Sequence, residues 1–178
     1  MQIDQKIIPH LWFDTNAEEA VNFYVSLFAN SKVGKISRYG KSGPGPEGSI
    51  MSVGFTLNGQ EFAAINGGPH FQFNGAVSFL IWCDTQGEID SLYDRLLDGG
   101  KAQQCGWLSD RFGLVWQVNY SGIPQMMTSP DAEASTRAMK AMMGMTKSTS
   151  SASRTPSPAN DQRPETSSGV GSSGLSQR

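Results

Sequence analysis

The sequence is poor in cysteine, in long apolar runs and in clustered positive charge. Its two cysteines, Cys83 and Cys105, do not form a CxxC pair, which argues against zinc or a disulfide framework and favours a cytoplasmic protein with free thiols. No apolar run approaches the ~20 residues that span a bilayer, and no signal peptide is evident at the N-terminus. The net charge is −2 without a basic patch, so neither a membrane nor a nucleic acid is expected as a partner.

Aromatic residues are missing from the end of the chain: no Phe, Trp or Tyr follows Tyr120. From Thr146 onward the sequence is mostly Ser, Thr, Pro and Gly, which offer almost nothing to bury. Residues 146–178 are therefore predicted to be a disordered, Ser/Pro/Gly-rich tail. The folded domain is expected over residues 5–145.

This domain contains an internal repeat. The segment "HLWFDTNAEEAVNFYVSLF", from His10, aligns with "FLIWCDTQGEIDSLYDRLL", from Phe79. Each has an apolar run typical of a strand, then Asp-Thr, then an apolar pattern with helical spacing. The Asp-Thr pairs predict helix starts, because their side-chain oxygens can accept hydrogen bonds from the first free amides of a helix.

Strand candidates follow each predicted helix. In the first half they are "VGKISRYG", "SIMSVGFTLNG" and "EFAAING", and Asn58-Gly59 predicts a hairpin between the last two. In the second half they are "KAQQCGWL", "GLVWQVNY" and "PQMMTS". The repeated order of strand, helix and three strands predicts an α+β fold of two βαβββ modules, at about residues 5–67 and 76–128.

A further helix is predicted at about residues 131–145. Its methionines at 139, 142 and 143 fall along one side. A stripe of this kind indicates packing far more often than a cofactor site, because methionine fills irregular apolar gaps.

Several motifs, in order, resemble one family. These are "PHLWFDTNAEEAVNFYVSLFANSKV", "LNGQEFAAINGGPHFQFNGAVSFLIWCDT", "EIDSLYDRLLDGG" and "QCGWLSDRFGLVWQV". Together they resemble the PhnB-like branch of the vicinal oxygen chelate superfamily, whose members include glyoxalase I, extradiol dioxygenases and bleomycin-resistance proteins. The branch often carries the label 3-demethylubiquinone-9 3-methyltransferase. The resemblance covers residues 5–145 and implies curved mixed sheets around a pocket, and a homodimer.

The resemblance also implies positions for metal ligands. In metal-dependent members, inward-facing His, Gln or Glu hold a divalent ion that acts as a Lewis acid. The position in the opening strand falls on Ile8 or His10, and its counterpart in the second module on Ser78. The position in the last strand falls on Gln117. The position near the end of the first module falls at residues 63–65, which carry no ligand atom.

A metal site would thus depend on His10 and Gln117, whereas a stable divalent site generally wants at least three protein ligands. No cofactor is therefore expected, and a divalent metal is the alternative. Without a metal, His10 is interpreted as a hydrogen-bonded histidine of a half-buried sheet. Gln117 is then an amide that satisfies a buried partner or lines a wet pocket.

Strand alternation gives the predicted pocket its walls. If Gln117 points inward, the polar groups Ser78 and His10 would join it, with Trp12 and Trp82 as aromatic walls. An apolar cavity with a few polar groups is the usual form of a small-molecule site. The predicted ligand-binding residues are therefore His10, Trp12, Ser78, Trp82 and Gln117.

Four other polar residues are also considered as candidates. His70, between the modules, could reach a pocket rim or an interface, or have no role. Asp110 and Arg111 are interpreted as turn residues with a local ion pair. Cys105 has no base nearby in the sequence and is expected to be inert or partly buried.

Two classes of function remain. A small-molecule-binding protein of the glyoxalase/bleomycin-resistance type is favoured, because an aromatic pocket, usually at a dimer interface, suffices for it. The alternative is a divalent-metal-assisted lyase, isomerase or dioxygenase, so enzymatic activity is left open. Methyl transfer is less favoured, because the strands lead into "DTNAEE" and "DTQGEI" rather than a glycine-rich loop. The sequence identifies neither the ligand nor a role for the tail.

Overall fold

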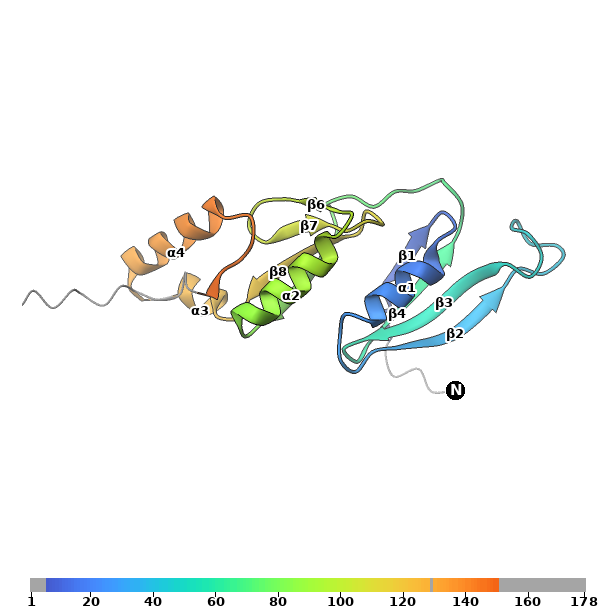
Figure 1. Cartoon of the computed structure of the whole chain (residues 1–178), viewed down its shortest axis with the longest axis horizontal. Coiled ribbons are helices and arrows are strands. Elements are labelled where there is room, and N and C mark those ends of the chain that lie inside the picture. Colours follow the sequence, from blue (N-terminus) through green and yellow to red (C-terminus); the bar gives the residue numbers. More distant parts are fainter. Residues whose placement is uncertain (1–5, 129, 151–178) are drawn as a thin grey trace, which may run out of the picture.

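The protein is built from two modules that share one architecture. The computed structural model describes residues 6–128 and 130–150. Each module contains a four-stranded mixed sheet and one main helix, and two more helices follow at the C-terminal end (Figure 1). The predicted α+β fold of two βαβββ modules is confirmed.

The first module has the strand order β1-β4-β3-β2. Its β1 runs parallel to β4, and the other neighbours are antiparallel. The β3–β4 turn is the predicted Asn58-Gly59 hairpin, with positive φ at both residues. The elements are β1 (His10–Phe13), α1 (Ala17–Val25), β2 (Lys32–Arg38), β3 (Ile50–Leu57) and β4 (Gln60–Asn66).

The second module repeats this topology with the order β5-β8-β7-β6. The parallel pair is now β5 and β8. The segment "KAQQCGWL" supplies two short strands rather than one. The elements are β5 (Phe79–Cys83), α2 (Gln86–Leu97), β6 (Lys101–Ala102), β7 (Trp107–Ser109) and β8 (Val115–Tyr120).

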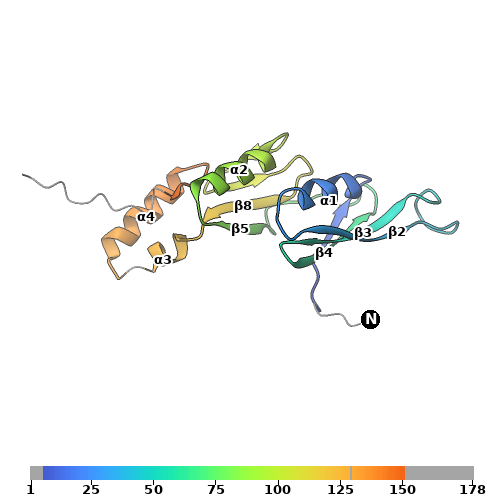
Figure 2. The same ribbon diagram turned by 60° about the horizontal axis from the view of Figure 1, so that its bottom comes forward.

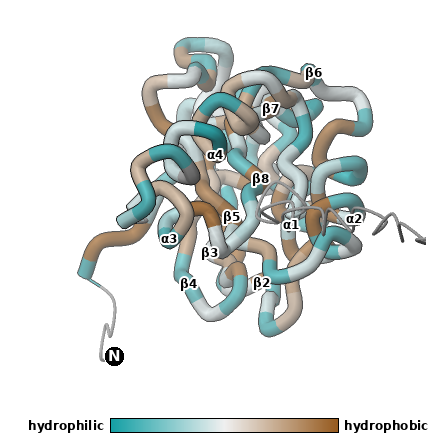
Figure 3. Tube along the Cα trace, turned by 90° about the vertical axis from the view of Figure 1, so that its left-hand side faces the viewer, coloured by the Kyte–Doolittle hydropathy of each residue, from teal (hydrophilic) through white to brown (hydrophobic). Residues whose placement is uncertain are grey.

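The C-terminal part differs from its prediction in two respects. "PQMMTS" was expected to be a strand, but its first four residues lie in the helix α3 (Ile123–Met127), with proline in the first turn, where it breaks no hydrogen bond. The helix α4 (Ala132–Gly144) lies within the predicted range. Viewed from this end of the molecule, α3 and α4 lie in front of the second sheet (Figure 3).

The packed part of the chain also extends beyond the predicted start of the tail at 146. Ser148 is buried, and its hydroxyl accepts a hydrogen bond from the Tyr120 amide at 3.3 Å. Lys147 Nζ lies 2.6 Å from Asp94 Oδ1 and 3.3 Å from Asp90 Oδ1 on α2. Residues 146–150 therefore belong to the second module, and residues 151–178 lie outside the described part of the chain.

The two main helices begin in different ways. At α2, Thr85 is the N-cap, and its Oγ1 accepts a hydrogen bond from the Glu88 amide. Glu88 Oε2 in turn accepts one from the amide of Asp84, the residue before the cap. The predicted counterpart at α1 is absent, because the residue before the helix is Asn16, whose side chain makes no capping bond. Instead, Asn66 Oδ1 at the end of β4 accepts a hydrogen bond from the Ala17 amide at 2.8 Å.

Both α1 and α2 lie on the same side of the molecule, so each sheet has one covered and one uncovered face (Figures 1 and 2). The covered faces form one hydrophobic core with residues of both modules. Aromatic contacts join the modules: Phe62 packs against Phe79 at 5.3 Å between ring centres, and Phe28 against Trp116 at 6.2 Å. No helix among residues 6–128 and 130–150 is long and apolar enough to cross a membrane.

A buried carboxylate also links the modules. Asp110 Oδ2 accepts hydrogen bonds from the Tyr24 hydroxyl at 2.8 Å and from Trp116 Nε1 at 2.9 Å. Its Oδ1 accepts from the amides of Phe112 and Leu114. Burial raises the pKa of Asp110, and the hydrogen bonds from Trp116 and Tyr24 oppose this rise.

The predicted local ion pair between Asp110 and Arg111 is therefore wrong. The Arg111 guanidinium lies over the Phe23 ring of α1 at 4.1 Å and near Glu19, with 3.9 Å between Nε and Oε1. Asp110 and Arg111 thus both contact the first module, because α1 approaches this turn and presents Tyr24, Phe23 and Glu19 to them.

Candidate functional site

The uncovered face of the second sheet holds the polar pair Ser78 and Gln117. Gln117 Nε2 donates a hydrogen bond to Ser78 Oγ at 2.8 Å, between residues 39 apart in sequence. In the sheet register Gln117 is paired with Leu80 on β5 and with Trp107 on β7. The glutamine amide is therefore flanked by apolar side chains and has one hydroxyl partner.

Large apolar side chains on the same face remain open to solvent. Leu80 is 43% exposed and Trp82 is 46% exposed. Each Å² of apolar surface left in water costs about 25 cal/mol relative to burial. An uncovered patch that contains these residues is typical of a surface that contacts a ligand or another chain.

The same two residues line a cavity of about 660 Å³ at the junction between the modules. Its walls come from the end of α1, the β3–β4 hairpin, β5 and α2. Among the described residues of the wall, one is ionisable, Glu88, and the side-chain amides are those of Asn58 and Gln60. The aromatic members of the wall are Phe28, Phe62, Phe79, Trp82 and Trp116.

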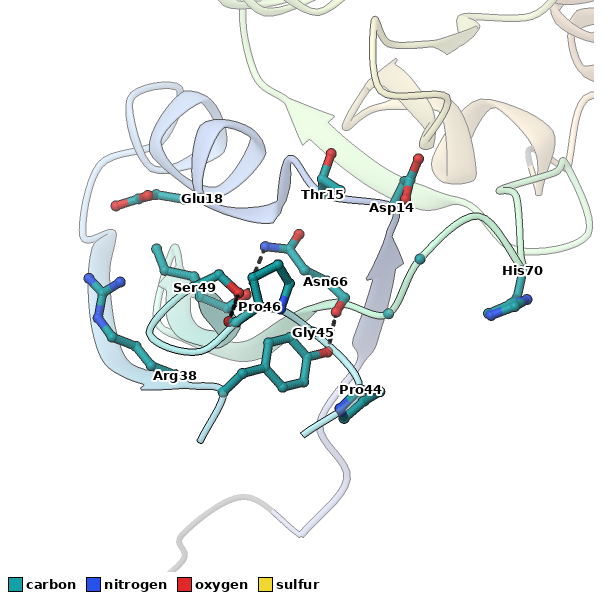
Figure 4. A pocket seen from close by; sticks show the side chains of 14 residues that line it. Asp14, Thr15, Glu18, Arg38, Pro44, Gly45, Pro46, Ser49, Asn66 and His70 are labelled. Atoms are coloured by element: carbon teal, nitrogen blue, oxygen red, sulfur yellow. Dashed lines mark hydrogen bonds between the residues drawn. The ribbon is translucent and has the colours of Figure 1, made fainter. Parts of the chain in front are cut away.

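A second cavity of about 660 Å³ lies in the first module, between the first turn of α1 and the loop between β2 and β3 (Figure 4). The Tyr39 hydroxyl donates to the Asn66 carbonyl at 2.6 Å. A Cβ at Gly45 would come within 2.5 Å of the Tyr39 ring, so this loop can fold over the tyrosine only with glycine there. The charged groups of Asp14, Glu18 and Arg38 line this cavity.

The structure places the predicted ligand-binding residues in different surroundings. Ser78 and Gln117 are together, and Trp82 lines the junction cavity. His10 is exposed at the start of β1, on the first sheet. His70, which was expected to reach a pocket rim or an interface or to have no role, lines the cavity of the first module.

Trp12 is held by the link between the modules. Its Nε1 donates a hydrogen bond to the Gly68 carbonyl at 2.9 Å, and its ring meets Phe71 edge-on at 5.0 Å. Gly67 lies so close that a Cβ there would overlap the indole. Within this chain, the linker therefore packs against Trp12.

The two predicted metal ligands, His10 and Gln117, are not adjacent within one chain. His10 and Gln117 lie on different sheets, and the Gln117 amide nitrogen already bonds to Ser78. Among residues 6–128 and 130–150, no group of three or more His, Cys, Asp or Glu side chains could hold a metal ion. A single chain thus offers fewer ligands than such a site generally requires.

Two features of the site were not recognisable from the sequence. The junction cavity needs residues from both modules, and only Trp82 of its wall was predicted. The residue that fixes the modules around it, Asp110, looked like an ordinary turn residue because aspartate is common in turns. The "SDRFG" turn carried no signal of contact with α1.

Comparison with known proteins gives consistent results. Residues 5–119 match the protein family described as 3-demethylubiquinone-9 3-methyltransferase. A PhnB protein from Bacillus cereus is 40% identical, with 66% of this chain and 100% of that chain covered and a TM-score of 0.61. Protein PA1353 from Pseudomonas aeruginosa is 25% identical, with 66% and 98% covered and a TM-score of 0.55. No curated protein matches the chain. The predicted resemblance to PhnB-like proteins is confirmed.

Proposed function

The chain belongs to the 3-demethylubiquinone-9 3-methyltransferase family, and from this premise we propose that it binds a small molecule. The ligand has a flat apolar body and at least one hydrogen-bonding group. The body occupies the junction cavity against Trp82, and the polar group reaches the Ser78–Gln117 pair. The observation that carries this proposal is the juxtaposition of the pair with Leu80, which lines the cavity and is paired with Gln117.

The composition of the cavity wall suits such a ligand. Aromatic rings supply most of the binding energy for a flat ligand, and a small number of polar groups fix its orientation. Gln117 bonds to Ser78 through its amide nitrogen, so within residues 6–128 and 130–150 its carbonyl oxygen is left as an acceptor. A ligand hydroxyl or N–H would therefore find a partner there.

We propose further that the functional form is a homodimer. The uncovered faces of the two sheets lie side by side on one side of a single chain, so one chain does not enclose a ligand between them (Figure 2). A second copy would cover the exposed Leu80 and Trp82, and would allow His10 and Trp12 of one chain to approach Ser78 and Gln117 of the other.

A metal-assisted lyase, isomerase or dioxygenase is the second candidate. His10 and Gln117 lie on different sheets, so in this proposal the dimer brings them together. Metal analysis of the full chain, purified without a metal-affinity tag, tests it directly. Stoichiometric zinc, nickel, manganese or iron, lost from His10→Ala, would establish the metal-dependent alternative.

Methyl transfer has less support, although the family description names it. The turns from β1 to α1 and from β5 to α2 consist of residues 14–16 and 84–85, and neither contains glycine. The usual methyl donor requires a glycine-rich loop between strand and helix. Saturable binding of S-adenosylmethionine would reverse this ranking.

The cysteines are compatible with a cytoplasmic protein, which we propose as the location. Cys83 and Cys105 are both free thiols, and Cys83 is buried. Free thiols persist most readily in a reducing compartment. Fractionation of the source cells with an antibody against the full chain would test this.

The ligand proposal is tested by a thermal-shift screen with planar aromatic compounds that carry hydroxyl or amide groups. A compound that raises the Tm of the wild type should lose most of this effect with Trp82→Ala and with Gln117→Ala. Val77→Ala and Gln103→Ala are the controls, because both positions are exposed and neither lines the cavity. An unchanged response of both test variants would rule out the site.

A further inference from the structure

Six of the eight methionines lie between residues 126 and 145, and the structure divides them into two groups. Four line a narrow gap between α3 and α4: Met126, Met127, Met142 and Met145. Of the stripe at 139, 142 and 143 that was expected to pack, only Met142 lies in this gap. The other two are on the outside of α4, where Met139 is 42% exposed and Met143 is 56% exposed. Packing therefore accounts for the first group and leaves the thioethers of the second accessible.

One of the two accessible thioethers meets a thiol. Cys105 Sγ, in the loop between β6 and β7, lies 3.8 Å from Met143 Sδ. Two backbone hydrogen bonds hold these segments together, from the Cys105 amide to the Met145 carbonyl at 2.8 Å and from the Gly106 amide to the Thr146 carbonyl at 2.9 Å. The main chain thus fixes the approach of the two sulfur atoms.

We propose that Cys105, Met143 and Met139 form a binding site for a soft monovalent cation, Cu(I). Thiolate and thioether sulfur are the ligands that select Cu(I) over the harder divalent ions. Met139 precedes Met143 by one helical turn on the same face of α4, so its thioether can reach an ion bound by the other two. This site is separate from the junction cavity, which none of the three residues lines.

The spacing of the sulfur pair fits one bridging ion. Metal–sulfur bonds are about 2.3 Å long, and two such bonds at a near-tetrahedral angle place the sulfur atoms about 3.8 Å apart. Cys105 Sγ and Met143 Sδ have this separation. An ion could therefore bind between them with little movement of the main chain.

The second cysteine provides an internal comparison. Cys83 is fully buried in the core of the second module, and burial raises the pKa of its thiol to about 12. A protonated thiol without access to solvent is a poor ligand, because the thiolate is the form that binds metal. Any Cu(I) bound by the folded chain through a thiol should therefore involve Cys105.

The test is a Cu(I) titration of the reduced full chain in competition with a chromophoric Cu(I) chelator. One ion per chain is expected, and Cys105→Ser should lower the affinity by at least about 100-fold, since even partners of metal ligands contribute 10–100-fold. Met143→Leu and Met139→Leu should each lower it by about tenfold. Met142→Leu is the matched control, because its side chain packs between the helices.

X-ray absorption of the loaded protein supplies a second readout, for which a shell of sulfur neighbours alone is expected. Circular dichroism tests whether Cys105→Ser is folded. If it is not, the two leucine variants still test the site, because leucine has nearly the volume of methionine. Binding that survives Cys105→Ser, or that is unaffected by both leucine variants, would overturn the proposal. Binding that both leucine variants leave unchanged would indicate that the Cys105 thiol binds Cu(I) without the two thioethers.

Discussion

Individual residues of this protein acquire their roles from partners far away in the sequence. Asp110 illustrates this, because it accepts four hydrogen bonds from donors in both modules. One donor is Tyr24 of α1, and the other three lie shortly after Asp110 in the second module. A carboxylate buried in this way stabilises the fold only while all its donors are in place. Asp110, which looks like a turn residue in the sequence, therefore connects the two modules next to the junction cavity.

Asp110→Asn should destabilise the protein by about 1–3 kcal/mol, because the amide nitrogen would face a donor instead of accepting from it. Urea unfolding monitored by tryptophan fluorescence measures the change. Asp98→Asn is the control, since Asp98 is exposed after the end of α2. Equal midpoints for the two variants would contradict the assigned role of Asp110.

The two cysteines should differ in their reaction with iodoacetamide. Because the pKa of Cys83 is raised to about 12, about one thiol in ten thousand is ionised at pH 8. Its labelling rate in the native protein should be far below that of the partly buried Cys105, and should rise about tenfold per pH unit up to pH 10. Peptide mass spectrometry measures both rates, and equal rates in the native protein would contradict the prediction.

At the scale of elements, the two modules reach the same topology with different local bonds. The sequence repeat places Asp-Thr before each helix, but only Thr85 caps its helix. At α1 the corresponding task falls to Asn66 of β4. The difference arises because β4 ends beside the first turn of α1, where an amide side chain can reach the helix.

Thr85→Ala should therefore lower the free energy of unfolding by about 1 kcal/mol, as expected for the loss of a capping oxygen. Thr15→Ala, at the equivalent position of the repeat, should change it by less than about 0.5 kcal/mol. Chemical denaturation of both variants gives the comparison. A larger loss from Thr15→Ala than from Thr85→Ala would show that the repeat caps the helices in the opposite way.

At the scale of the whole molecule, the main question is what covers the open faces of the sheets. The helices cover one side, and the exposed Leu80 and Trp82 lie on the other. The proposed homodimer would bury them. In the part of the chain that the structure describes, the edge strand β5 that carries them is paired with β8 alone. An apolar surface next to a free strand edge readily pairs with another chain unless it is protected.

Leu80→Lys should convert the protein from a dimer to a monomer, because a buried, unpaired charge opposes association. Light scattering coupled to size-exclusion chromatography measures the mass. Met139→Lys is the control, since Met139 is similarly exposed on α4, away from this face. A wild type that is monomeric at micromolar concentration would refute the dimer, and a dimer that persists in Leu80→Lys would place its interface elsewhere.

The sequence by itself determined the order of the elements from β1 to α2 and the repeat of the modules, but not the short strands β6 and β7 or the helix α3. Apolar spacing distinguishes strand from helix within short segments, and Asn58-Gly59 fixes a turn through its own backbone preferences. The cap of α2 was foreseen, because Asp84, Thr85 and Glu88 are close together in the chain. The family resemblance was readable for the same reason, since its motifs are contiguous.

Only the tertiary structure decided which distant residues meet. Gln117 was singled out by its polarity within an apolar strand, but its hydrogen bond to Ser78 depends on the pairing of β5 with β8. The contact between Cys105 and Met143 depends on how the segment after α4 returns to the second module. These contacts arise from the pairing and packing of segments that are far apart in the chain, which the pattern within one segment does not specify.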